Sequence, residues 1–139
     1  MENQEIYINL SKLVTKLKNS EDPKRKYEYI LWLGKKLKHP TTNILAPENK
    51  VKGCVSEVFV KAVIKEGKLY WEGYSDALIT KGLLAFLIEG LNELTPEEVV
   101  NLNKKFIEDT GLKASLTPSR SNGFLNILLK MQSQANEFL

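Results

Sequence analysis

The stretch VFVKAVIKEGKLYW, residues 58–71, decides the fold, because β-branched and aromatic residues lie on both sides of Glu66-Gly67. Such residues are typical of strands and the Glu-Gly pair is a turn signal, so the stretch predicts an antiparallel hairpin. Val51 and its neighbours predict a short additional strand, separated from the hairpin by Gly53-Cys54. We therefore expect a small antiparallel sheet of about three strands.

Helical patterns precede this hairpin. Apolar residues recur at helical spacing over residues 6–17, and Asp22-Pro23 has the composition of an N-cap followed by the first residue of a second helix, which should run to about Lys36. The residues of this helix expected to face inward are Tyr27, Ile30, Leu31 and Leu37. Residues 38–48 predict a long loop without a low-complexity run.

The most apolar helix is expected directly after the hairpin, from Asp76 to about Leu91, with Ser75 as its cap. Because it is apolar nearly all round, it should be the central buried helix. Its core face is predicted to comprise Leu78, Ile79, Leu83, Phe86, Leu87 and Leu91. Later signals are a capping box at residues 95–98, a helix around residues 104–109 stopped by Gly111, and Thr117-Pro118-Ser119 before the last helix.

Length and composition fit one α+β domain over residues 1–139. The chain is 42% hydrophobic and 27% charged, close to the average for globular proteins. Its longest apolar stretch, residues 82–88, is far shorter than the ~20 residues of a transmembrane helix, and the N-terminus has no apolar signal region. We therefore expect a cytoplasmic protein with no membrane association. No heptad seam is readable in the sequence, and we expect either a monomer or a weak homodimer.

The charge is uneven along the chain. Residues 1–70 contain 14 Lys and Arg against 8 Asp and Glu, a net +6, whereas residues 71–139 contain 6 against 9, a net −3. A basic half attracts anionic partners, but only 2 of the 20 cations are arginine, which base readout and phosphate binding favour. The composition therefore favours a solvated face or an acidic protein partner, and we expect no nucleic-acid partner.

Cys54 is the one cysteine of the chain, so an internal disulfide and a CxxC metal site are excluded. It follows Gly53, where the backbone can turn sharply, and Lys52 two residues earlier would favour the thiolate. Ser56 is a candidate hydrogen-bond partner of the sulfur. These residues alone leave two interpretations open, a reactive thiol and a small buried hydrophobe.

Other candidates for chemistry are few. His39, the one histidine, is the candidate base for a hydrolase in which Cys54 is the nucleophile, although a loop histidine is usually just solvated. Asp76 and Glu72 form a candidate acid and base pair, but Asp76 in a first helical turn also complements the helix dipole. Arg120 lies beside a predicted helix N-terminus, where a cation gains nothing from the dipole, so it is a candidate partner for an anion or a thiolate.

Three segments of the chain match one family pattern in the same order. Residues 53–59, GCVSEVF, match Gly-Cys-x-Ser-x-Val-aromatic; residues 73–83, GYSDALITKGL, match G-x-S-D-A-x-I-x-K-G-L; and residues 116–123, LTPSRSNG, match L-T-P-S-R-x-x-G. The tract 22–34 also fits. Together these segments resemble the SufE family, and the order and spacing agree from about residue 5 to the end.

The resemblance implies a small antiparallel sheet packed by helices, a fold shared with IscU-type scaffolds. It also implies a sulfur acceptor for iron–sulfur cluster assembly. In that role Cys54 would take the terminal sulfur from the persulfide of a SufS-type cysteine desulfurase, stimulate that enzyme and pass sulfur to a cluster-assembly scaffold complex. The chain itself would need no cofactor and no metal, because the pyridoxal phosphate is on the desulfurase.

The resemblance also implies supporting residues around the thiol. They are Gly53 as a hinge, Ser56, Asp76 holding the cysteine loop at rest, and Arg120 bonded to the same region. Val55 and Val58 are expected to line a pocket that protects the persulfide. Val55 and Tyr74 depart from the family pattern, in which polar or small residues are common at these positions, and both departures bear on how the loop docks on a partner.

Three alternative functions remain in view. A cluster scaffold of the related fold usually needs several thiolates, and this chain has one. A hydrolase that uses Cys54 and His39 would lose its activity on replacement of the histidine. For a non-catalytic interaction module, replacement of Cys54 by serine would be silent.

Overall fold

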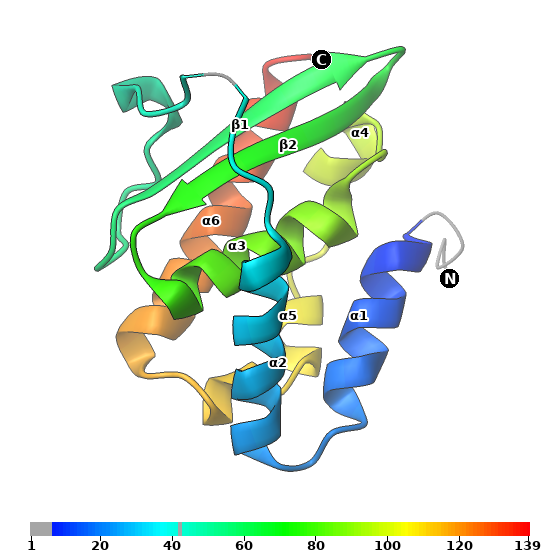
Figure 1. Ribbon diagram of the computed structural model, residues 1–139. Coiled ribbons are helices and arrows are strands. Elements are labelled where there is room, and N and C mark those ends of the chain that lie inside the picture. The colour runs from blue at the N-terminus through cyan, green and yellow to red at the C-terminus, as the bar shows by residue number, and fades with distance from the viewer. Residues whose placement is uncertain (1–6, 42) are drawn as a thin grey trace.

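The computed structural model describes residues 7–41 and 43–139, so the predictions for Ile6 and Thr42 lie outside the described residues. A hairpin and helices form the α+β fold that the sequence predicts (Figure 1). The elements, in chain order, are α1 (Ile8–Lys18), α2 (Pro23–Lys36), η1 (Pro47–Asn49), β1 (Val58–Lys65), β2 (Lys68–Ser75), α3 (Leu78–Leu91), α4 (Pro96–Val100), α5 (Phe106–Asp109), η2 (Leu112–Ala114) and α6 (Pro118–Asn136).

The hairpin is confirmed. Strands β1 and β2 pair antiparallel around Glu66 and Gly67, whose φ angles of 53° and 81° suit a two-residue hairpin turn. The additional strand is reduced to one bridge, between Lys50 and Phe59. The backbone turns away directly after this bridge, with Gly53 at φ +82°, so pairing cannot continue. Within the described residues the sheet therefore has two strands rather than about three.

Helix α3 is central, as predicted, but it begins later than expected. Ser75 pairs with Val58 at the end of β2, and its hydroxyl accepts a hydrogen bond from the Ala77 N–H at 3.3 Å. Ala77 is therefore the N-cap, and the predicted cap at Ser75 was wrong because the hairpin ladder retains that residue. Leu78 is 73% exposed, so its predicted inward position was also wrong.

Helix α3 packs between α1 and α2 on one side and the hairpin and α6 on the other (Figure 1). A Cβ on Gly82 would lie 2.1 Å from the Ile30 carbonyl oxygen, so only glycine lets α2 approach this closely. Phe86 of α3 meets Phe124 of α6 edge to face, with ring centroids 5.7 Å apart. Tyr27 of α2 is 37% exposed, which contradicts its predicted inward position.

The other three helix starts predicted from capping residues are confirmed. The Asp22 side chain accepts from the Lys24 N–H at 3.0 Å before α2, and the Thr95 capping box precedes α4. Thr117 likewise caps α6, and Gly111 in the left-handed conformation follows α5. Across the described residues, we find no helix with the length and apolar character to cross a membrane.

Candidate functional site

The segment that carries Cys54 lies between the bridge at Lys50 and the start of β1, and it rests on α6. Gly53 has φ +82°, a conformation that favours glycine. The side-chain amide of Asn126 in α6 donates to the Gly53 carbonyl at 3.1 Å. A Cβ on Gly53 would lie 2.5 Å from that amide nitrogen. Backbone conformation and close approach therefore both require glycine before the cysteine.

The thiol of Cys54 is half-buried against the backbone of α6. Its Sγ donates to the Gly123 carbonyl at 3.7 Å, and a Cβ on Gly123 would lie 3.4 Å from the sulfur. Burial raises the pKa of the Cys54 thiol above its usual value, and the Arg120 guanidinium opposes part of that rise. Of the two cations that the sequence offered for the thiolate, Lys52 and Arg120, the one that acts on the thiol is Arg120.

Arg120 joins three elements at this site. Its Nη1 donates to the hydroxyls of Ser56 and Thr80, which lie 3.4 Å apart. The segment after the cysteine is thereby linked to α3 and α6. Ser56, which was expected to bond the sulfur, bonds this arginine instead, because the helix backbone occupies the place beside the thiol.

Asp76 contacts the other end of the cysteine segment. Its Oδ1 accepts from the Glu57 N–H at 3.0 Å, and its own N–H donates to the Glu57 carbonyl at 3.3 Å. The expected position of Asp76 near the cysteine loop is therefore observed. We call residues 53–57 the cysteine loop. Polar contacts hold this loop at Gly53, before the thiol, and at Ser56 and Glu57, after it.

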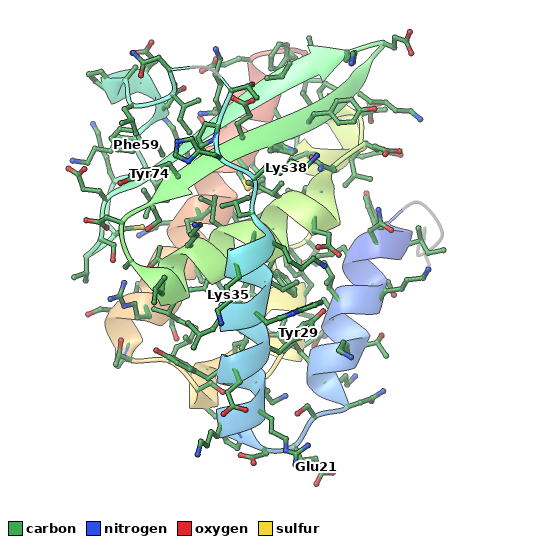
Figure 2. The ribbon with its side chains drawn as sticks, viewed as in Figure 1. Glu21, Tyr29, Lys35, Lys38, Phe59 and Tyr74 are labelled. Atoms are coloured by element: carbon green, nitrogen blue, oxygen red, sulfur yellow. The ribbon has the colours of Figure 1, made fainter. Side chains whose placement is uncertain are left out.

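The two valines that follow Cys54, Val55 and Val58, differ in burial. Val58 is fully buried in the core, whereas Val55 is 73% exposed. The prediction that Val55 lines a protective pocket is wrong, because its side chain lies on the surface at the position after Cys54. Tyr74 lies opposite Phe59 on the hairpin (Figure 2), close to the strand ends from which the cysteine loop departs.

The structure does not bring His39 to Cys54. Residues 37–41, which we call the connector, cross the hairpin in front of β2 (Figure 1), and the Thr41 N–H donates to Glu72 at 3.3 Å. His39 lines a cavity of about 730 Å³ between this connector, β2 and α3, and Cys54 is not among its lining residues. Over the described residues no contact between His39 and Cys54 is found, so the nucleophile and base pair of the hydrolase alternative is not formed here. The same residues contain no cluster of three or more metal-ligating side chains.

Sequence reasoning assigned no role at the site to Thr80, Gly123 and Asn126, although Gly123 closes the matched segment 116–123. One signal was available for Gly123, because an isolated glycine inside a predicted helix is unfavourable and indicates close packing. Asn126 gave no comparable signal. Its role depends on how closely α6 approaches a loop more than seventy positions earlier in the chain.

A family model for SufE, described as an Fe-S metabolism associated domain, matches residues 11–135. The chain belongs to the SufE family. The SufE segments at residues 53–59, 73–83 and 116–123 converge in the structure, where they supply Cys54, Asp76 and Arg120 to one site. This convergence links the family pattern to a three-dimensional arrangement around the thiol.

Three curated relatives of this chain have SufE in their names and are 38–49% identical to it. An uncharacterised SufE-like protein of Synechocystis sp. is 49% identical over 99% of this chain and 87% of its own length. The chloroplastic/mitochondrial SufE-like protein 1 of Arabidopsis thaliana is 38% identical over 95% of this chain and 36% of its own length. A cysteine desulfuration protein SufE of Plasmodium vivax is 40% identical over 81% of this chain and 46% of its own length. The chain thus spans less than half of the two longer relatives.

A solved structure also matches this SufE-family fold. The solution structure of a hypothetical protein from Thermus thermophilus has a TM-score of 0.81 and covers 93% of this chain and 94% of its own. Sequence identity is 24%, so this likeness bears on the fold alone.

Proposed function

We propose that this chain accepts sulfur on Cys54 from the persulfide of a SufS-type cysteine desulfurase and delivers it to an iron–sulfur cluster-assembly scaffold. The observation that carries the proposal is the place of the single cysteine, in a loop with a left-handed glycine before it and polar contacts at both ends. Membership of a family associated with Fe-S metabolism supports it.

The chemistry requires one thiol. The Cys54 thiolate attacks the terminal sulfur of the desulfurase persulfide, a new sulfur–sulfur bond forms on Cys54, and the former bond breaks. The desulfurase cysteine leaves as a thiolate and takes up a proton equivalent to the one that Cys54 lost, so the step is balanced without an outside oxidant or reductant. Because the chain has no second cysteine, no internal thiol can convert the new persulfide into a disulfide and release sulfide.

The resting conformation protects the thiol. Cys54 is half-buried, its pKa is raised by burial, and its sulfur lies on the Gly123 carbonyl. A protonated, partly covered sulfur reacts slowly with oxidants and with small disulfides. The proposal therefore requires the cysteine loop to move outward on the desulfurase, with Gly53 as the hinge.

Stimulation of the desulfurase follows from the same step. Each transfer regenerates the thiolate of the enzyme, so turnover rises wherever sulfur removal limits it. In this proposal the pyridoxal phosphate is bound by the desulfurase and frees sulfur from L-cysteine, while this chain supplies only the accepting thiol. The exposed side chain of Val55, next to the thiol, would lie at the contact between the two proteins.

Intact mass after incubation with a SufS-type desulfurase, pyridoxal phosphate and L-cysteine tests the proposal. We expect a gain of one sulfur atom on the wild-type chain, reversed by a thiol reductant and absent in Cys54→Ser. His39→Ala is the matched control and should gain sulfur like the wild type, whereas a hydrolase would depend on that histidine. No gain with desulfurases that load other acceptors would contradict the carrier role.

A further inference from the structure

Three residues of α6 contact the cysteine loop at successive turns of the helix. Arg120 bonds Ser56, Gly123 accepts from the Cys54 thiol, and Asn126 donates to the Gly53 carbonyl. The spacing of three residues places them along one side of the helix. The loop is therefore held on α6 before, at and after the cysteine.

The contact of Asn126 differs from the other two, because it acts at the left-handed glycine. Gly53 at φ +82° sets the direction in which the chain enters Cys54. The Asn126 amide bonds the carbonyl of that same residue at 3.1 Å, which fixes the orientation of the peptide joining Gly53 to Cys54. Asn126 thereby orients the backbone that directs the thiol onto Gly123.

We propose that Asn126 is a positioning residue that holds the cysteine loop in its covered conformation and so sets how often the Cys54 thiol is exposed. The inference rests on the proposed function for its biological meaning, since it describes how a carrier keeps its sulfur covered until a partner binds. The geometry itself does not depend on that function.

The covered and released loops form a two-state equilibrium. A hydrogen bond that exists only in the covered state shifts this equilibrium by its net free energy, and a partner that binds the released state shifts it back. One neutral hydrogen bond changes such a ratio about fivefold, and less where water competes for it. Loss of the Asn126 amide should therefore raise the released population about two- to fivefold.

The alkylation rate of Cys54 by iodoacetamide, measured without any partner, tests the inference. We expect Asn126→Ala to alkylate about two- to fivefold faster than the wild type near neutral pH. The midpoint of its pH–rate profile should move down toward that of an ordinary thiol, because the released thiol is no longer desolvated. Asn122→Ala is the matched control: it makes the same substitution at an exposed position of the same helix.

A double-mutant cycle with Gly53→Ala makes the test specific. In the wild-type background the added Cβ meets the Asn126 amide nitrogen at 2.5 Å and breaks the contact, so Gly53→Ala alone should also speed alkylation. If the contact is the cause, adding Asn126→Ala to Gly53→Ala should raise the rate little further. Additive effects of the two changes would overturn the proposal.

Two further results would overturn the positioning role of Asn126. Equal alkylation rates and pH profiles for Asn126→Ala and the wild type would overturn the positioning role. So would an acceleration that matches a loss of global stability in urea, because transient unfolding would then expose the thiol. Since no desulfurase is present, failure of sulfur loading leaves this result unaffected, and the two proposals fail separately.

Discussion

Helix α3 and the cysteine loop lie side by side but are held by different forces. The side chains of Leu84, Phe86 and Leu87 in α3 are fully buried among apolar residues. The cysteine loop is held by partly exposed hydrogen bonds: Arg120 and Asn126 donate to it, and the Asp76 carboxylate accepts from it. Apolar burial stabilises the whole domain, whereas a few polar contacts set a local conformation that can open without unfolding the rest.

The largest effect should come from the core. Phe86→Ala removes a ring that packs edge to face on Phe124, and we expect the free energy of unfolding to fall by about 3–5 kcal/mol. Urea unfolding followed by circular dichroism measures the loss. Leu78→Ala, at a position 73% exposed in the same helix, should change stability by less than about 0.5 kcal/mol. A loss below about 1 kcal/mol for Phe86→Ala would contradict the claim that apolar burial in α3 stabilises the whole domain.

A substitution at Val55, the residue after Cys54, should weaken binding to the desulfurase without changing the stability of the fold. Val55→Asp alters a side chain that is 73% exposed, so stability should stay within about 0.5 kcal/mol. A carboxylate desolvated at the proposed contact should raise the half-saturating concentration for desulfurase stimulation about tenfold. Val63→Asp is the control, because it makes the same substitution at an exposed position of β1 outside the cysteine loop; it should leave this concentration unchanged. Equal effects of the two changes would place the contact elsewhere.

The pH dependence of the thiol tests how the loop covers it. Burial raises the pKa of Cys54, so the midpoint of its alkylation profile should lie higher in the folded protein than in urea. The folded state then retains the proton that the unfolded state has lost, so stability should fall as the pH rises through the pKa of the unfolded thiol. A folded midpoint at or below the unfolded one would show that the Arg120 charge outweighs desolvation.

The smallest effect should come from the far end of the loop. Asp76→Ala removes the acceptor of the Glu57 N–H, and we expect about a twofold rise in Cys54 alkylation with less than about 1 kcal/mol lost in stability. Asp76→Asn retains an amide oxygen at the same place and should behave closer to the wild type. If Asp76→Asn and Asp76→Ala react equally fast, the carboxylate charge, rather than the hydrogen bond, holds the loop.

The amino-acid sequence alone predicts much of this protein, because local signals determine those features. The hairpin turn at residues 66–67, the caps at Asp22, Thr95 and Thr117, and the apolar run of α3 depend on neighbouring residues and helical or strand periodicity. The same local signals support the SufE family and single out Cys54. Predictions failed where a neighbouring element competes for a residue, as at Ser75, which the hairpin retains.

Only the tertiary structure decides what surrounds the thiol. The exposure of Val55, the separation of His39 from Cys54 and the contact of Asn126 with Gly53 arise where chain segments distant in sequence meet. Periodicity reports which face of an element is apolar, but it carries no information about which polar group a distant backbone will approach. Neighbouring residues in the sequence thus identify Cys54 as the reactive residue. Whether its thiol is covered depends on how α6 packs against the cysteine loop.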